Sequence, residues 1–293
     1  MKPKATLILG GGSALGLAHI GALEALERHF EISGIIGTSM GAIIGALYSC
    51  GLSPQDILRI ATRISNARVF SPLNLDRKIQ GIFDGKMLFR LYREWTNDYD
   101  ISNGQIPFIA VAYDLLSRST MLFREGKYAV ALRASSSLPL VFSPFAYGKH
   151  LFVDGGIEHP LPLAFAGMLS SDLVIAVNVL PYVQTQAHLV SVTEAKATKS
   201  KRVGQIEVVI QSTFHNQAYL ALRDISTYAP DIIIDAAMPE GRPFAFHKAV
   251  EFYRFGVMQT QKTLDSYNEP NFIRRMRHHY RKLVMRKTTL PDG

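Results

Sequence analysis

A serine between two glycines is the first group in this chain that could do chemistry. The segment Gly37-Thr38-Ser39-Met40-Gly41 follows the apolar run Ile32–Ile36 and precedes a second apolar run that begins at Ala42. This pattern is typical of a nucleophile elbow, in which a serine occupies a sharp turn between a strand and a helix. The glycines leave room for the turn and for a substrate. Plain strand-to-helix turns show the same pattern, so on its own it makes Ser39 a candidate nucleophile only.

A glycine cluster near the N-terminus could stabilise negative charge. Gly10-Gly11-Gly12-Ser13-Ala14-Leu15-Gly16 lies between a strand-like run, Ala5–Leu9, and a helical run, Ala18–Phe30. Side chains do not obstruct the N–H groups of such a loop, and the positive end of the following helix points the same way. The alternative is a dinucleotide or phosphate loop, but Leu15 stands where the third glycine of that fingerprint belongs, and no Gly-Lys-Ser/Thr follows.

An aspartate follows a third apolar segment. In Leu151-Phe152-Val153-Asp154-Gly155-Gly156, a strand-like run ends in a carboxylate and a pair of glycines. An isolated Asp-Gly-Gly is most often a hairpin turn. Beside a serine nucleophile, however, a carboxylate could accept the hydroxyl proton.

Together, these three segments resemble the patatin-like phospholipases, in particular their compact bacterial members. The resemblance runs from about Thr6 to about Asn178 and includes the helix at His19–Leu23 and the segment Ala134-Ser135-Ser136-Ser137-Leu138-Pro139. It implies a three-layer α/β fold with a central, mostly parallel sheet flanked by helices. It also implies an enzyme that hydrolyses fatty-acyl esters of phospholipids or lysophospholipids.

The resemblance assigns roles to individual residues. The family uses a Ser–Asp dyad without a histidine, which corresponds here to Ser39 and Asp154. Its oxyanion loop corresponds to Gly11, Gly12 and Ser13, and the glycines expected to support the dyad are Gly37, Gly41, Gly155 and Gly156. Two positions depart from the family pattern, because Ser13 stands where glycine is common and Leu15 replaces the usual arginine or lysine. The missing positive charge is expected to change either the strength of the oxyanion site or the lipid head group that the protein prefers.

Burial is what would make an aspartate a useful base. A carboxylate with a reference pKa near ~3.9 is a weak base in water, and an apolar environment raises that pKa. The apolar residues Leu151–Val153 and Ile157 predict such an environment for Asp154. We expect Ser39 to attack an ester carbonyl while Asp154 accepts its proton, and we expect a water molecule activated by Asp154 to release the acyl group.

Histidines offer the main alternative to a Ser–Asp dyad. His159 follows Asp154 closely and could complete a Ser-His-Asp triad, although a neighbour in sequence need not lie beside the nucleophile. We interpret His159-Pro160 as a loop that leads into a helix around Leu161–Met168. His19 follows the glycine loop and either orients that loop or is a hydrogen-bonded structural histidine.

Length and composition favour one large α/β domain. The chain has 293 residues, of which 47% are hydrophobic, and this is enough for a sizeable core. Strands are expected near Ala5–Leu9, Ile32–Ile36, Phe108–Tyr113, Thr120–Arg124, Leu151–Val153, Leu173–Asn178 and Asp231–Asp235, with helices between most of them. The polar segment Pro181–Lys201 is predicted to be a loop.

The uncharged stretch Ile32–Gln55 is long enough to cross a bilayer. We interpret it as a buried strand, turn and helix, because glycines bracket Ser39 and Ser49-Cys50-Gly51 adds polarity. The single cysteine excludes an internal disulfide, and no cleavage site of the secretory type follows the N-terminus, so we expect a cytoplasmic protein. No Cys/His spacing suggests zinc and no oxygen-rich loop suggests calcium, so we expect neither a metal nor another cofactor.

The C-terminal residues carry most of the net charge of +8, since residues 274–293 hold seven Lys and Arg against one acid. Apolar side chains recur among these charges at helical spacing. We expect a patatin-like domain of residues 1–273 and a basic amphipathic tail of residues 274–293. We expect the tail either to contact the anionic inner face of the membrane or to dock on the domain with its basic side facing solvent. We expect no nucleic-acid partner, because no reading motif accompanies the charge.

Two apolar stretches, Phe70–Trp95 and Leu138–Phe145, are candidates for lining or covering an acyl-chain groove, although such residues more often form ordinary core. Two functional alternatives stay open. The first is a non-catalytic relative that binds or senses lipid, which the change at Leu15 favours. The second is a transferase that passes the acyl group to an alcohol or thiol.

Overall fold

The computed structural model describes residues 1–66, 85–181, 183 and 204–267. The strands are β1 (Lys4–Leu9), β2 (Glu31–Thr38), β3 (Phe108–Asp114), β4 (Ser119–Phe123), β5 (Phe145–Tyr147), β6 (His150–Asp154), β7 (Leu173–Asn178) and β8 (Ile232–Asp235). The α-helices are α1 (Ala18–Leu26), α2 (Met40–Ser49), α3 (Pro54–Asn66), α4 (Gly85–Trp95), α5 (Tyr128–Ser135), α6 (Gln205–Tyr228) and α7 (Ala249–Ser266). Short 3-10 helices are η1 (Ser13–Leu17), η3 (Ile101–Asn103), η4 (Gly155–Ile157), η5 (Leu163–Met168) and η6 (Phe246–Lys248).

The strands of the described residues form one mixed, mostly parallel sheet in the order β5-β6-β3-β2-β1-β7-β8, with β4 paired to β3. The pairs β1–β2, β1–β7, β2–β3 and β7–β8 are parallel, whereas β3–β4, β3–β6 and β5–β6 are antiparallel. Every strand expected from the sequence is present, with shifts of a few residues at the ends. The short strand β5 was not expected, because a three-residue strand after a proline-rich run shows no periodicity.

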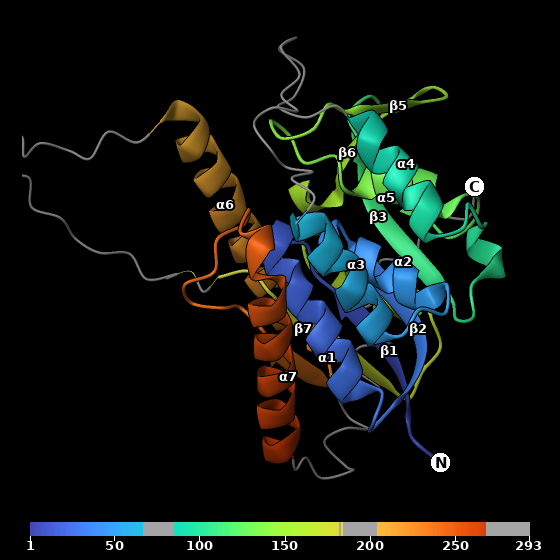
Figure 1. Ribbon diagram of the computed structural model, residues 1–293, viewed down its shortest axis with the longest axis vertical. Helices are drawn as coiled ribbons and strands as arrows, with labels where there is room; N and C mark the ends of the chain where they lie inside the picture. The colour runs from blue at the N-terminus through green and yellow to red at the C-terminus, as the bar shows by residue number, and fades with distance from the viewer. Residues whose placement is uncertain (67–84, 182, 184–203, 268–293) are drawn as a thin grey trace, which may run out of the picture.

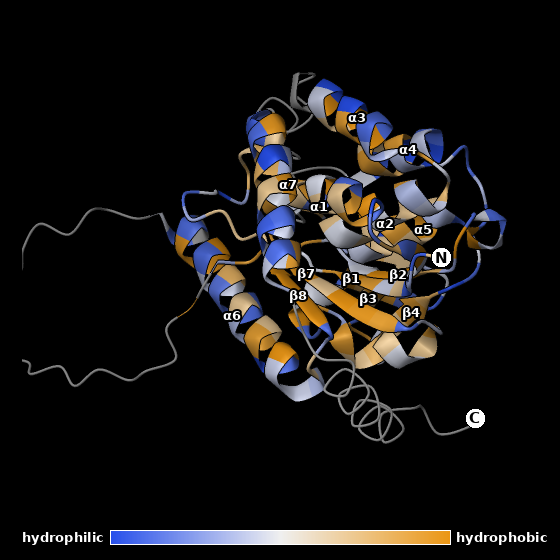
Figure 2. Cartoon of the chain, turned by 90° about the horizontal axis from the view of Figure 1, so that it is seen from below, coloured by the Kyte–Doolittle hydropathy of each residue, from blue (hydrophilic) through white to orange (hydrophobic). Residues whose placement is uncertain are grey.

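Helices cover both faces of the sheet, as Figure 1 and Figure 2 show. Helices α1, α2, α5 and α7 pack over one face, and α3 and α4 lie outside them. Helix α6 packs with η5 on the other side. The expected three-layer α/β arrangement is therefore confirmed. The helix expected around Leu161–Met168 is instead the 3-10 helix η5, which begins only at Leu163, because a residue that precedes a proline disfavours helical backbone and Leu161 precedes Pro162.

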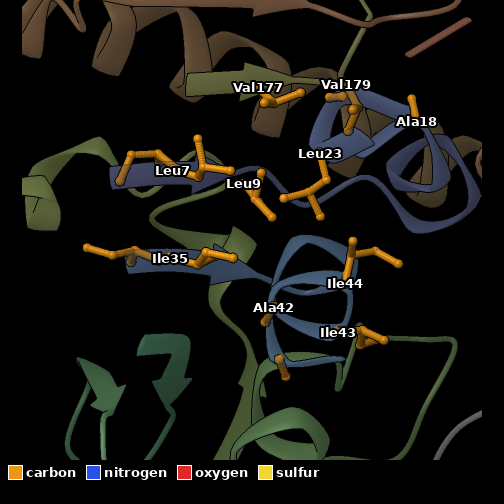
Figure 3. Close-up of a cluster of buried hydrophobic side chains, with 14 of the residues drawn as sticks. Leu7, Leu9, Ala18, Leu23, Ile35, Ala42, Ile43, Ile44, Val177 and Val179 are labelled. Carbon is orange, nitrogen blue, oxygen red and sulfur yellow. The ribbon is translucent and has the colours of Figure 1, made fainter. Parts of the chain in front are cut away.

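The core lies between the sheet and the helices α1 and α2. Figure 3 shows Leu7 and Leu9 of β1 and Ile35 of β2 in one cluster with Leu23 of α1 and Ile44 of α2, and Leu9 lies beside Leu23. These side chains are buried almost completely. Five consecutive residues of β1 are buried, which is typical of a parallel strand that is covered on both faces.

The uncharged stretch Ile32–Gln55 forms most of β2, the turn at Ser39, α2 and the start of α3, which confirms its interpretation as a buried strand, turn and helix. Within the described ranges, no helix combines the length and the apolar character needed to cross a bilayer. Of the predicted loop Pro181–Lys201 only residues 181 and 183 are described, and the tail 274–293 lies outside the described residues.

Strands β2 and β6 meet end to end on the same edge of β3. Strand β2 runs parallel to β3, and its last residue, Thr38, pairs with Val111. Strand β6 runs antiparallel to β3, and its last residue, Asp154, pairs with Ala112. Strand β4 pairs with the same residues of β3, so it occupies the other edge. The register therefore brings the residue after β2 next to the last residue of β6.

Helices α1 and α7 approach closely at two glycines. A Cβ atom at Gly256 would lie 2.0 Å from the carbonyl oxygen of Ala18, and one at Gly21 would lie 2.0 Å from the carbonyl oxygen of Tyr253. Any side chain at these positions would push the two backbones apart.

We expect Gly256→Ser to lower the free energy of unfolding by about 1–3 kcal/mol, because the added atoms overpack the contact between α1 and α7. The matched control is Gly204→Ser, since a Cβ atom at Gly204 meets nothing within 4 Å and the residue has an ordinary φ of −64°. Chemical denaturation measures both variants. Equal stabilities would show that the close approach is not needed.

Candidate active site

Ser39 occupies a strained turn between β2 and α2. Its backbone has φ 55° and ψ −120°, a combination that costs a non-glycine residue about 1–3 kcal/mol. The flanking glycines make the turn sterically possible. A Cβ atom at Gly41 would lie 2.2 Å from the carbonyl oxygen of Leu9, and one at Gly37 would lie 2.6 Å from the nitrogen of Ala42. The turn exposes the Ser39 side chain partly, at the N-terminus of a helix.

Asp154 is a buried carboxylate in contact with Ser39. Its exposed fraction is 2%, and its Oδ1 accepts a hydrogen bond of 2.8 Å from the N–H of Gly156. Burial raises the pKa of Asp154 to about 6, against the smaller, lowering effects of the Ser39 side chain and the Gly156 N–H. Within the described residues Oδ2 has no hydrogen-bond partner, and the side chain of Ser39 lies close enough to the carboxylate to lower its pKa. The structure thus brings Ser39 and Asp154 together.

The glycine loop lies beside Ser39. A Cβ atom at Gly11 would lie 3.4 Å from the Cβ atom of Ser39. The N–H of Gly11 donates a hydrogen bond of 2.7 Å to the carbonyl oxygen of Pro160. By contrast, the N–H groups of Gly12 and Ser13 donate to no acceptor in the described part of the chain. Two amides without an acceptor among the described residues, in a loop whose Gly11 lies beside Ser39, are a suitable site for an oxyanion.

Of the two departures from the family pattern, only the one at Leu15 has a local explanation. Ser13 has φ 52°, in the left-handed region that favours glycine, so this serine is strained. Leu15 is buried beneath the segment 236–245, since a Cβ atom at Gly241 would lie 2.6 Å from its Cδ2. The N–H of Ala14 also donates to the carbonyl oxygen of Pro243 at 2.8 Å. A charged side chain at position 15 would be buried there, and this accounts for the leucine.

His19 holds the start of the glycine loop. The residue is fully buried, and its Nε2 lies 2.7 Å from the carbonyl oxygen of Gly10. Burial lowers the pKa of His19 to about 4, so the ring is neutral near pH 7, and we assign the proton to Nε2 because its partner is a carbonyl oxygen. The two expectations for His19 therefore describe one contact, a structural hydrogen bond that orients the loop.

His159 faces helix α6. Its Nδ1 lies 3.8 Å from Oδ2 of Asp224, and its ring packs edge-on against Phe165 with centroids 4.8 Å apart. Its carbonyl oxygen accepts a hydrogen bond of 2.8 Å from the hydroxyl of Thr38. Among the described residues the ring makes no hydrogen bond to Ser39 or Asp154. This geometry favours a dyad over a Ser-His-Asp triad.

An apolar pocket begins at Met40, the residue after Ser39, and follows α2. It holds about 530 Å³ of empty space, part of which is open to solvent. Residues of α2, α3 and α4 line it, among them Ile43, Leu47, Ile57, Leu88 and Trp95. Tyr92 also lines the pocket, and burial raises its pKa to about 12, with a smaller contribution from the charge of Asp154.

The two apolar stretches singled out in the sequence have different places. The described end of Phe70–Trp95 supplies Leu88 and Trp95 to the pocket, while residues 70–84 lie outside the described part. In Leu138–Phe145, Leu138, Val141 and Phe142 are buried core residues. This second stretch is thus mainly ordinary core, as the simpler interpretation expected.

Comparison with known proteins gives the class to which this site belongs. The family model described as patatin-like phospholipase matches residues 7–166, more than half of the chain. The chain belongs to the patatin-like phospholipase family. The matched region contains the glycine loop, Ser39 and Asp154.

Relatives are known from bacteria and animals. An uncharacterized NTE family protein of Mycobacterium tuberculosis is 35% identical over 177 residues, which cover 60% of this chain and 49% of that protein. The human patatin-like phospholipase domain-containing protein 6 is 31% identical over 179 residues, which cover 59% of this chain and 13% of that protein. The chain thus spans about half, or much less, of the length of these relatives.

Solved structures with a similar arrangement include bacterial proteins. VipD from Legionella pneumophila aligns over 91% of this chain and 67% of its own, with 11% identity and a TM-score of 0.44. ExoU, in its complex with SpcU from the type III secretion system of Pseudomonas aeruginosa, aligns over 90% of this chain and 52% of its own, with 15% identity and a TM-score of 0.47.

We expect Asp154→Asn to stabilise the fold at alkaline pH. Burial raises the pKa of Asp154 from 3.8 to about 6, so between these values the native state binds more protons than the unfolded state and stability falls as the pH rises. Asparagine keeps the shape without the charge. At pH 8 the free energy of unfolding should therefore exceed that of the natural protein by about 1–3 kcal/mol.

The stabilisation should shrink as the pH falls through 6 toward 4, because Asp154 then becomes protonated in the native state. Urea denaturation at both pH values measures the difference. A variant that is less stable than the natural protein at pH 8 would contradict the buried-carboxylate explanation.

Proposed function

We propose that this protein is a serine acyl hydrolase that cleaves fatty-acyl esters of phospholipids or lysophospholipids with Ser39 as nucleophile and Asp154 as base. The observation that carries the proposal is the contact between a serine in a strained turn and a buried carboxylate whose pKa is raised to about 6. A base with a pKa near the working pH is well matched to proton transfer. Membership of the patatin-like phospholipase family supports lipid acyl hydrolysis as the general activity.

In the proposed reaction, Ser39 Oγ attacks the ester carbonyl carbon while its proton moves to Asp154. The N–H groups of Gly12 and Ser13 hold the negative oxygen, and Gly11 leaves space beside Ser39. The carbon–oxygen ester bond then breaks, and the leaving alcohol takes the proton from Asp154. A water molecule gives a proton to Asp154 and attacks the carbonyl carbon of the acyl-serine. The bond between this carbon and Ser39 Oγ then breaks, Asp154 returns the proton to Oγ, and the fatty acid is released.

The glycines after Asp154 support the base in this proposal. The N–H of Gly156 holds one carboxylate oxygen, and the other oxygen stays available for Ser39. A Cβ atom at Gly155 would lie 2.4 Å from the carbonyl oxygen of Val111, so only glycine lets the chain turn this close to β3.

The pocket supports a fatty-acyl substrate. Its described walls along α2, α3 and α4 are mainly apolar side chains, which suit an alkyl chain and include no charged residue that could pair with a charged substrate. Leu15 is buried under segment 236–245, and among the described residues the amides of Gly12 and Ser13 have no acceptor. The leucine is therefore compatible with an oxyanion site, and this supports the enzyme over a non-catalytic lipid-binding relative.

The remaining parts of the proposal rest on the sequence. These are a hydrolase domain of residues 1–273, a basic tail of residues 274–293 that contacts an anionic membrane, and a cytoplasmic location at the inner membrane face. The positive charge of the tail and the lipid nature of the proposed substrate support them.

We expect Ser39→Ala and Asp154→Asn each to reduce ester hydrolysis by at least about 10³-fold, because the two groups act as a unit. Hydrolysis of chromogenic esters and defined phospholipids measures the loss, and a fluorophosphonate probe should label the natural protein but not Ser39→Ala. Ser171→Ala and Asp172→Asn are matched controls away from the site and should keep full activity. In the natural protein, kcat/KM should rise with pH up to about 6 and then level off, as Asp154 loses its proton.

Full activity of either site variant would refute the proposed dyad. A folded natural protein that binds lipid but takes no label would favour the non-catalytic alternative. Acyl transfer to an added alcohol that exceeds hydrolysis would favour the transferase.

The pocket predicts which acyl chains each α2 side chain affects. Leu47 lies about two helical turns beyond Met40, whereas Ile43 lies within the first turn. Leu47→Trp should lower kcat/KM roughly tenfold for a palmitoyl ester and leave a butyryl ester unchanged, since only the longer chain reaches that depth. Ile43→Trp should impair both esters. Identical effects of the two variants on both esters would place the acyl chain elsewhere.

A further inference from the structure

Three consecutive serines stand at the C-terminal end of α5, where the sequence assigned them no role. Ser135, Ser136 and Ser137 are buried, with exposed fractions of 0%, 5% and 0%. Buried hydroxyls require hydrogen-bond partners, so the partners show what each serine does. Ser136 bonds to the hydroxyl of Tyr92 at 2.9 Å and to the carbonyl oxygen of Leu132 at 2.7 Å.

Ser135 joins the turn at Ser39 to strand β3. Its Oγ accepts a hydrogen bond of 2.9 Å from the backbone N–H of Ser39 and donates one of 2.6 Å to the carbonyl oxygen of Val111. Val111 is the residue opposite Thr38, where the pairing of β2 with β3 ends. The hydroxyl therefore bridges the two strands at the point where their own ladder stops.

The N–H of Ser39 needs this bridge. It precedes the first residue of α2, so it has no acceptor within that helix, and the turn removes it from the ladder of β2. Without Ser135 the N–H would lose its acceptor in a partly buried place. The strained φ of 55° would then lose the contact that helps to maintain it.

The same short segment also holds the base. The N–H of Asp154 donates a hydrogen bond of 3.0 Å to the carbonyl oxygen of Ser137, two residues after Ser135. The backbones of Ser39 and Asp154 are thus tied to one turn of chain that packs against β3. Figure 1 shows α5 beside β3 and β6.

We propose that Ser135 is a positioning residue, whose hydroxyl holds Ser39 in the strained turn at the correct distance from Asp154. This inference rests on the proposed function, because it concerns the geometry of the same dyad. Removal of the hydroxyl lets the turn relax and moves the Ser39 side chain out of line with the carboxylate. A displacement of about 1 Å in a reacting group costs on the order of 10²-fold in rate. The acyl pocket lies along α2, so substrate binding is not affected directly.

The experiment compares Ser135→Ala with Ser136→Ala in the full-length protein. Both variants lose a buried hydroxyl at the end of the same helix, but only the first loses a contact to Ser39. We expect Ser135→Ala to lower kcat and the rate of fluorophosphonate labelling by roughly 10- to 100-fold, with KM changed by less than about twofold. Ser136→Ala should stay within about threefold of the natural kcat at a similar Tm. Ser135→Thr retains a hydroxyl and should recover most of the lost rate.

Amide hydrogen exchange at Ser39 tests the contact without any activity. Exchange at this amide should become faster in Ser135→Ala and remain unchanged in Ser136→Ala. Equal losses of kcat in the two alanine variants, or unchanged exchange at Ser39 in Ser135→Ala, would overturn the inference. If the natural protein takes no label and hydrolyses no ester, the proposed function fails. If the natural protein is active and Ser135→Ala is labelled at the same rate, only the role of Ser135 is refuted.

Discussion

The candidate site depends on two strands that end against each other along one edge of β3. Strand β2 stops opposite Val111 and strand β6 stops opposite Ala112, and they run in opposite directions. Neither strand can continue, because the other occupies its path. The chain must therefore leave the sheet at the same place after each of the two strands. Ser39 and Asp154 are the residues at these two departures. Ser39 and Asp154, which are far apart in the sequence, meet because the register of both strands on β3 leaves them no other position.

The same junction sets the chemistry of the carboxylate. Asp154 is buried where β6 ends beside β2, so water has little access, and burial raises its pKa to about 6. The backbones of several elements approach so closely there that side chains are excluded. Gly41 faces the backbone of Leu9, and Gly155 faces that of Val111. Glycines therefore serve two purposes at this site, since they allow the sharp turns and also admit neighbouring backbones.

The C-terminal third shapes a region that the family model does not reach. The match to the patatin-like phospholipases ends at residue 166, yet the segment 236–245 covers η1 and packs on Leu15. The position where this chain departs from the family pattern is thus in contact with a part of the chain outside the matched region. Leu15 and segment 236–245 form one buried contact, which accounts for a leucine at the position where the family usually has arginine or lysine.

The sequence by itself determined the class of fold, nearly all of the strands and the turns at Gly10–Gly16, Ser39 and Asp154, because these patterns depend on residues that are neighbours in the chain. Contacts between distant segments were decided only by the tertiary structure. It showed that Asp154 rather than His159 contacts Ser39, that the N–H of Gly11 is already bonded to Pro160, and that Ser135 bonds to the N–H of Ser39. The segment Ala134–Pro139 was visible in the sequence, but three adjacent serines look alike until the strands and helices around them are placed. Local patterns fix where the chain turns, whereas strand register and packing fix which side chains face each other after the turn.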